Sequence, residues 1–170
     1  MGFGLCYGHW RIQQASDASD AALTVAVIQT NVSQDNKTYP TLEQEAQDWS
    51  RLLALTHQAN ASKSMVDLIV WPETVVPRAI NQASCEIWSS SQQYHHQIQL
   101  TARELQTHLL VGSLSKFDWK MIDVANHGQV PVADRKYNSV FLFEPDGAMS
   151  SLRYDKVHRV PFGEFIPWVE

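Results

Sequence analysis

The sequence has few cysteines, no cluster of basic residues and no long apolar run, and each absence argues against a class of protein. Two cysteines in 170 residues, Cys6 and Cys85, are too few for a disulfide scaffold and lack the paired spacing of a zinc site. Thirteen Lys and Arg stand against 18 Asp and Glu, a net charge of −5, so we expect no nucleic-acid partner. No segment approaches the ~20 apolar residues of a membrane-spanning helix, so these 170 residues are not expected to form a polytopic membrane domain.

The residues that are present indicate a globular domain. Hydrophobic residues make up 44% of the chain and charged residues 18%, which is typical of a folded protein with one core. The polar segment 17–20 reads as a linker, so we expect a short N-terminal stub over 1–20 and one domain over 21–170. His95 and His96 are adjacent, and neighbours on a helix diverge by about 100°, so we expect no metal site there. We expect no cofactor.

The pattern of apolar residues predicts alternating strands and helices. Strands are expected at 23–28, 68–71 and 108–112, helices at 41–60 and 99–107, and a β-hairpin of 137–143 with 149–156 around the turn Glu144–Gly147. The first strand is apolar almost throughout, which predicts burial on both faces. Residues 116–136 have no clear period and read as a long surface excursion. This order of strands and helices along the chain predicts an α/β fold with a mixed sheet.

Three features could carry chemistry. Glu73 directly follows a buried strand, at the strand end where open α/β sheets tend to place their sites. Lys156 alternates onto the same strand face as apolar residues, so its amine either snorkels at the strand end or is held near a carboxylate. Glu164 lies in the rigid, proline-bounded loop 160–167.

Together these segments resemble a known family. The phrases Trp71–Pro77, Tyr137–Ser139 and Tyr154–Pro167, with the Gln29–Asn31 phrase, are similar to the nitrilase-like domain of bacterial apolipoprotein N-acyltransferases, in the carbon–nitrogen hydrolase superfamily. The last phrase is the most specific, because it adds His158 and the run Pro-Phe-Gly-Glu-Phe-Ile-Pro to a lysine shared across the superfamily. The resemblance implies the N-terminal part of a nitrilase-like α-β-β-α sandwich with a mixed sheet, incomplete in this chain.

The resemblance also implies roles for residues and partners. Glu73 would be the general base, Lys156 the cation at the oxyanion, and Glu164 a supporting carboxylate. Such an enzyme moves an acyl chain from a phospholipid, through a cysteine thioester, to the diacylglyceryl-cysteine of an apolipoprotein. It would sit in the bacterial inner membrane through upstream helices, with this domain facing the periplasm.

The expected nucleophile has no counterpart in the chain. The family places its cysteine after the lysine, whereas Cys85 follows Glu73 by only twelve residues and lies in a polar context. The chain is therefore predicted to be an inactive piece of the enzyme. The first loop also differs, since Lys37 is followed by Thr38 and Tyr39 where the family often has tryptophan. Two other hypotheses stay open: a piece of a soluble amidase or nitrilase acting on a small C–N substrate, and a non-catalytic truncated binding module.

Overall fold

The structure is a computed structural model that describes residues 7–11, 23–32, 40–61, 65–125 and 127–158. Its centre is a five-stranded sheet in the order β1-β2-β3-β4-β5, in which β1, β2 and β3 are parallel and β4 and β5 are antiparallel to their neighbours. The elements are β1 (Val25–Val27), α3 (Leu42–Asn60), β2 (Leu68–Val70), α4 (Gln82–Ile87), α5 (Ser89–Leu105), β3 (His108–Val124), β4 (Gly128–Phe143) and β5 (Met149–Asp155). The predicted α/β class with a mixed sheet is confirmed.

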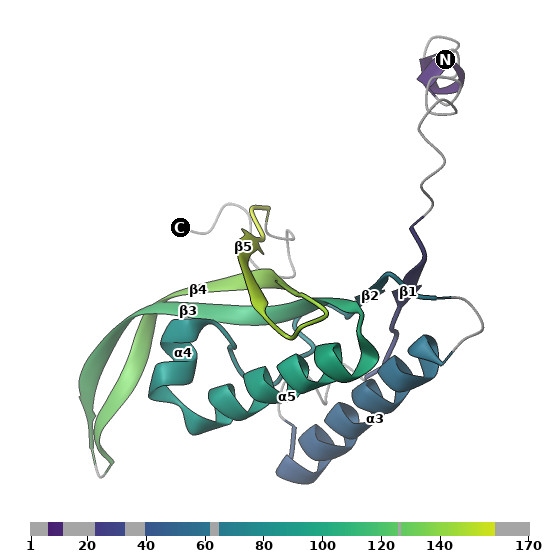
Figure 1. The fold of residues 1–170 in the computed structure, drawn as a ribbon. Helices are drawn as coiled ribbons and strands as arrows, with labels where there is room; N and C mark the ends of the chain where they lie inside the picture. The colour runs from purple at the N-terminus through teal and green to yellow at the C-terminus, as the bar shows by residue number, and fades with distance from the viewer. Residues whose placement is uncertain (1–6, 12–22, 33–39, 62–64, 126, 159–170) are drawn as a thin grey trace.

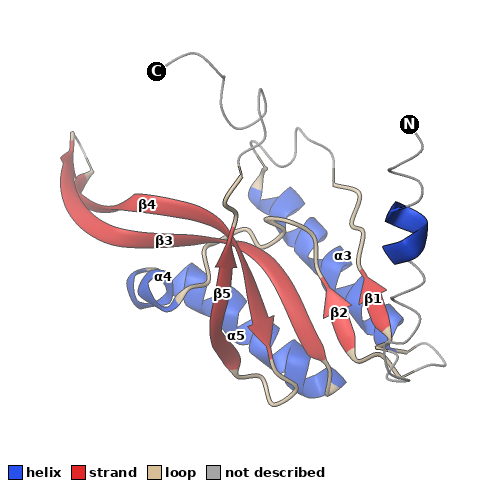
Figure 2. Cartoon of the chain, turned by 90° about the horizontal axis from the view of Figure 1, so that it is seen from above, coloured by secondary structure: helices blue, strands red, loops and turns tan. Residues whose placement is uncertain are grey.

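The helices α3, α4 and α5 all lie on one face of the sheet (Figures 1 and 2). The core forms between them and consists of alternate strand residues and inward-facing helix residues: Trp49, Leu52, Ile69, Ile98, Ala102, Leu109, Val111, Phe141 and Phe143. Parallel strands need crossover connections, and α3 and the α4–α5 pair supply them. The described residues thus make one sheet and one helical layer of the expected sandwich.

Helix α3 begins where the sequence predicts. The Thr41 hydroxyl accepts from the Gln44 backbone N–H at 3.2 Å, and the Gln44 side chain accepts from the Thr41 N–H at 2.9 Å. This reciprocal pair satisfies two of the N–H groups that a helix start leaves unpaired. The indole of Trp49 then packs edge-on against Trp71, with ring centroids 5.7 Å apart. The helix is therefore joined directly to the segment that follows β2.

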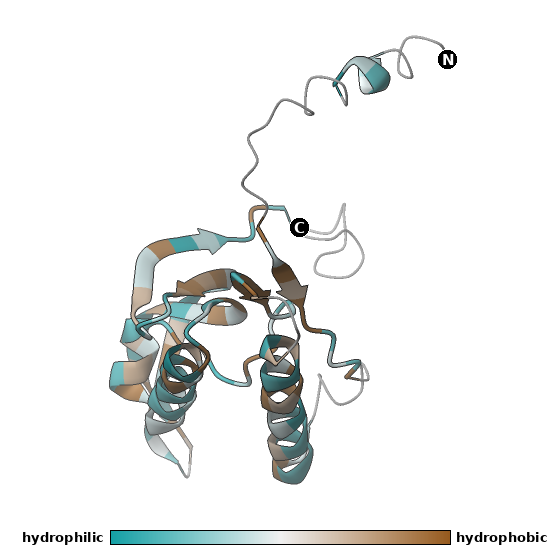
Figure 3. Cartoon of the chain, turned by 45° about the vertical axis from the view of Figure 1, so that its right-hand side comes forward, coloured by the Kyte–Doolittle hydropathy of each residue, from teal (hydrophilic) through white to brown (hydrophobic). Residues whose placement is uncertain are grey.

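The sheet face opposite the helices is open in the described part of the chain. Val27 is 74% exposed, Leu152 77% and Tyr154 63%. Figure 3 shows β1 as a strongly apolar strand at the edge of the sheet. The prediction that the first strand is buried on both faces is therefore wrong for these residues, because the described helices cover only one side of it.

The prediction of an irregular excursion over 116–136 is also wrong. This segment forms the outer half of the β3–β4 hairpin, with pairs that run from Lys116 with Lys136 to Val124 with Gly128. We call it the arm, because it extends beyond the helices and curls away from the rest of the sheet (Figure 1). Apolar residues do alternate with charged ones at Phe117, Trp119 and Met121. Residues near the turn break this alternation, so the sequence does not predict a strand over the whole segment.

The second hairpin agrees with the prediction. β4 and β5 pair in the register Ser139 with Asp155 and Phe143 with Met149, around a turn in which Gly147 has a φ of +81°. A φ of this sign favours glycine.

Near the N-terminus, residues 7–11 are helical, and the rest of the predicted stub lies outside the described residues. Within the described ranges, no helix combines the length and the apolar character needed to cross a bilayer.

Candidate functional site

Glu73 lies just beyond β2, where the chain passes very close to β3. The Trp71 N–H donates to the Leu110 carbonyl at 2.8 Å, and the Val75 N–H donates to the Gly112 carbonyl at 3.2 Å. A Cβ at Gly112 would lie 2.3 Å from the Pro72 carbonyl oxygen and 2.9 Å from the Glu73 Cα. Only glycine permits this approach, which places the Glu73 backbone against the sheet.

Lys156 is positioned by the end of the β4–β5 ladder. The backbone N–H of Lys156 donates to the Asn138 carbonyl at 2.8 Å, which extends the β4–β5 pairing one residue past the end of β5. The preceding residue, Asp155, accepts from the buried Ser139 hydroxyl at 2.6 Å and forms an ion pair with Arg153 at 2.8 Å. Anchoring Asp155 on the helix-facing side sends the next side chain to the opposite face, as strand alternation requires.

Glu73 and Lys156 meet across the sheet surface. The Lys156 Nζ donates to the Glu73 Oε1 at 2.9 Å, and their side chains are 27% and 60% exposed. Of the two placements considered for the lysine amine, the structure has the one beside a carboxylate. A carboxylate can accept a proton and an ammonium can stabilise a developing negative charge, so the two groups have complementary chemistry.

Asn138 completes this cluster. Its amide donates to the same Glu73 oxygen that Lys156 contacts, and its Oδ1 accepts from the Thr74 hydroxyl at 3.1 Å. Thr74 has a φ of +51°, in the left-handed region that non-glycine residues seldom occupy. Such strain persists where the surroundings enforce it, and it often marks a functional segment.

A cleft of about 380 Å³ opens beside Glu73. Its lining includes Glu45 and Arg78, which form an ion pair at 3.0 Å. The Tyr94 hydroxyl also donates to Glu45 at 2.9 Å, and burial, followed by this hydrogen bond, raises the pKa of Tyr94 to about 12. The cleft therefore has a fixed polar wall, and Glu73 is among the residues that line it.

Glu164, the third predicted site residue, lies outside the described residues, as does the first loop with Lys37. Among the residues that are described, no group of three His, Cys, Asp or Glu side chains is arranged to hold a metal ion.

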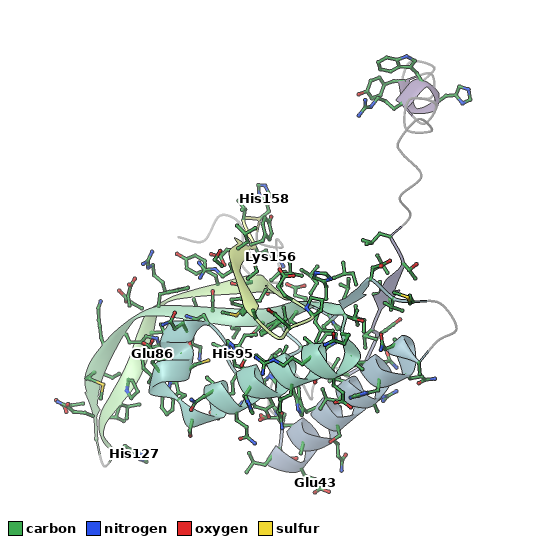
Figure 4. All side chains as sticks on the ribbon, in the orientation of Figure 1. Glu43, Glu86, His95, His127, Lys156 and His158 are labelled. Carbon is green, nitrogen blue, oxygen red and sulfur yellow. The ribbon has the colours of Figure 1, made fainter. Side chains whose placement is uncertain are left out.

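Cys85 is far from this cluster in the fold. It lies in α4, and its neighbour His95 sits in the helical layer below the sheet, whereas Lys156 lies above the sheet (Figure 4). His95 Nδ1 is 2.9 Å from the Ile80 carbonyl, which can only accept, so this nitrogen carries the proton. It cannot take a proton from the Cys85 thiol 3.6 Å away. Burial, and secondarily Glu86, raises the pKa of Cys85, which opposes formation of a thiolate.

The sequence does not predict a role for two residues that shape the site. Asn138 belongs to the matching phrase 137–139, and Gly112 ends a predicted strand. A glycine in a buried strand often marks a close backbone approach, and that signal could have identified Gly112. Nothing local to Asn138 indicates that its amide reaches Glu73, because the contact depends on strand order.

Comparisons with known proteins agree with this architecture. The apolipoprotein N-acyltransferase of Agrobacterium fabrum is 32% identical over 166 residues, which cover 95% of this chain and 27% of that protein. The apolipoprotein N-acyltransferase of Vibrio cholerae is 25% identical and covers 96% of this chain and 28% of that protein. The chain thus spans about a quarter of the length of these curated relatives.

Solved structures share the fold. A carbon–nitrogen hydrolase from Helicobacter pylori superposes with a TM-score of 0.54 at 16% identity, over 84% of this chain and 42% of that one. The NitN amidase from Neterenkonia superposes with a TM-score of 0.52 at 12% identity, over 88% and 51%. The sequence profile described as carbon-nitrogen hydrolase matches residues 24–167. Since this match takes in nearly the whole sheet and both crossovers, the chain belongs to the carbon–nitrogen hydrolase family.

Proposed function

We propose that the chain is the N-terminal part of the nitrilase-like domain of an apolipoprotein N-acyltransferase. The observation that carries the proposal is the contact of Glu73 with Lys156, at 2.9 Å, in a chain whose curated relatives bear that name. In this proposal Glu73 is the general base and Lys156 stabilises the oxyanion. Glu164 is proposed as a further carboxylate that supports the site.

The first half-reaction forms a thioester. Glu73 accepts the proton of a cysteine thiol, and the sulfur attacks the carbonyl carbon of a phospholipid ester. Negative charge develops on the carbonyl oxygen, next to the Lys156 ammonium, and the tetrahedral intermediate then collapses. The C–O bond breaks, and the protonated Glu73 gives its proton to the departing alkoxide oxygen, so the lysophospholipid leaves with a free hydroxyl.

The second half-reaction transfers the acyl chain. The α-amine of a diacylglyceryl-cysteine attacks the thioester carbonyl, an amide bond forms, and the C–S bond breaks. Glu73 removes the amine proton and returns it to the sulfur, so the free thiol is restored. Asn138 acts as a positioning residue, because its amide holds the carboxylate oxygen that also faces Lys156.

The nucleophile is proposed to lie outside this chain. Both cysteines precede Lys156, and Cys85 is in the helical layer with a proton-bearing nitrogen of His95 beside it. We further propose that the whole protein resides in the bacterial inner membrane, with this domain on the periplasmic side, and that phospholipid and diacylated apolipoprotein are its two substrates. On its own the chain is expected to be inactive.

The test uses the full-length protein in detergent micelles, a phospholipid with an alkyne-tagged acyl chain and a diacylated lipopeptide. Wild type should form a hydroxylamine-sensitive thioester and pass the tag to the peptide amine. Glu73→Gln keeps the shape of the side chain but removes the base, so thioester formation should slow by roughly 10²–10⁴-fold.

Glu104→Gln is the matched control, since Glu104 is an exposed carboxylate on α5. It should leave both half-reactions unchanged. Hydrolysis of small amides without transfer to the lipopeptide would contradict the acyltransferase proposal and favour a soluble amidase. Equal rates for Glu73→Gln and wild type would contradict the role of Glu73.

A further inference from the structure

A second cleft, which shares Arg78 with the cleft beside Glu73, lies between the arm and the junction of α4 and α5. Its volume is about 410 Å³, within the range of roughly 300–1,000 Å³ usual for small-molecule sites. Two lysines on the arm, Lys116 and Lys136, line it together with Arg78 from the loop that follows β2. We call it the Lys116–Lys136 cleft.

The strand register places these two lysines directly opposite each other. Lys116 pairs with Lys136 in the β3–β4 ladder, and like charges in such a pair destabilise a sheet. The other two cations of the arm are neutralised, Lys120 by Asp134 at 2.7 Å and Arg135 by Asp118. Within the described residues, neither Lys116 nor Lys136 has a carboxylate at ion-pair distance.

The charges around Lys116 are positive. Burial lowers the pKa of Lys116, and the nearby charges of Lys136 and Arg78 lower it further. Arg78 also lines the cleft, but its ion pair with Glu45 neutralises much of its charge. A chain of net charge −5 therefore has a locally electropositive cleft whose lysines lack counter-ions from its described residues.

Neutral donors face the same space. Ser91 lines the cleft and is only 2% exposed, yet its hydroxyl makes no hydrogen bond with any other described residue. Ser91 lies in the first turn of the 17-residue helix α5, whose N-cap, Trp88, provides no side-chain hydrogen bond. Ser90 and Ser91 of this first turn line the cleft, so the positive end of the helix dipole lies beside it.

The geometry points to a site for a phosphate-type oxyanion. We propose that the Lys116–Lys136 cleft binds the phosphate group of a small ester between the two lysines and the start of α5. Trp88 and Trp119 supply an apolar wall for the rest of the ligand. Two ammonium groups, a buried hydroxyl and a helix N-terminus together match the acceptors of a phosphate. This inference goes beyond the acyl-transfer proposal and needs no turnover.

The test is residue-resolved lysine footprinting on the full-length protein. A low dose of acetic anhydride acetylates neutral amines, and mass spectrometry then measures the rate at each lysine. Inorganic phosphate should protect Lys116 about tenfold, because a bound dianion that raises the amine pKa by one unit lowers its neutral fraction by that factor. Lys120, which is paired with Asp134, is the internal control and should change little.

Two variants and a salt control distinguish specific phosphate binding from general screening of the lysine charges by ions. Lys136→Gln should abolish the protection of Lys116, whereas Lys120→Gln should leave it intact. Sodium chloride at matched ionic strength should give no protection. Equal protection by chloride, equal protection at Lys120, or full protection in Lys136→Gln would each overturn the proposal.

Further ligands in the same assay identify the source of the phosphate. Phosphatidylglycerol and diacylglycerol are compared with inorganic phosphate in the same detergent. Protection by both phosphate compounds identifies the phosphate group as the determinant, and protection by phosphatidylglycerol alone identifies a lipid headgroup; either result supports the site. Protection by diacylglycerol equal to that by phosphatidylglycerol would overturn it, since diacylglycerol has no phosphate.

Discussion

Lys156 donates a hydrogen bond to Glu73 at 2.9 Å, although the two residues are 83 positions apart in the chain. Each is carried by a strand end, and three adjacent strand pairings bring those ends together. The pair is therefore a property of the sheet, and substitutions that alter either the charges or the backbone beneath them should affect activity in distinguishable ways.

Lys156→Arg in the full-length protein should slow thioester formation by roughly 10²–10³-fold although the charge is kept. A planar guanidinium cannot replace a compact ammonium at the position that Lys156 occupies beside Glu73. Rapid-quench measurement of the tagged thioester checks this. Lys120→Arg on the arm is the control, and a near-normal rate for Lys156→Arg would mean that Lys156 is structural.

Gly112→Ala should reduce both stability and activity. The added methyl would lie within 3 Å of the Pro72 carbonyl and the Glu73 Cα, so the backbone that carries the carboxylate must shift. Overpacking of this kind typically costs about 1–3 kcal/mol of unfolding free energy. Denaturant unfolding and thioester rates test the two effects. Gly8→Ala, where a Cβ has no neighbour within 4 Å, should change neither.

Cys85→Ser should leave thioester formation nearly unchanged, because Cys85 belongs to α4, which lies in the helical layer below the sheet (Figure 1). The raised pKa of Cys85, caused mainly by burial, also predicts slow alkylation by iodoacetamide at neutral pH. The rate should increase as the pH rises, since the thiolate is the reactive form. An acyl group mapped to Cys85 by peptide sequencing would contradict the proposed order of catalytic residues.

Leu152→Lys should act differently in the isolated chain and in the full-length protein. Leu152 is 77% exposed on the sheet face without helices, so a lysine there should reduce aggregation of the isolated chain. In the full-length protein a second sheet is expected to cover this face, and an unpaired buried charge should then lower the melting temperature by several degrees. Ser151→Lys, on the other face of β5, is the control. Equal effects in both proteins would contradict a covered face.

Much of the architecture follows from local patterns. The capping box at Thr41, the apolar runs that begin at Leu68 and just after His108 and the turn at Gly147 are short-range signals, and each element lies near its predicted position. No local pattern predicts the arm, because its outer residues break strict alternation and its strands are held by pairing between β3 and β4 and by ion pairs across that ladder. The exposure of Val27 depends on what covers the open face, which no local pattern specifies.

In the candidate site, too, local patterns predict some features and only the fold decides the others. The sequence makes Glu73 and Lys156 candidates, because Glu73 follows a buried strand and Lys156 shares a strand face with apolar residues, and the roles expected of them come from the family resemblance. The contact between them, the Asn138 amide on the same oxygen and the need for glycine at 112 came only from the fold. Such contacts depend on strand order and register, since a shift of one residue would turn Lys156 to the other face of the sheet.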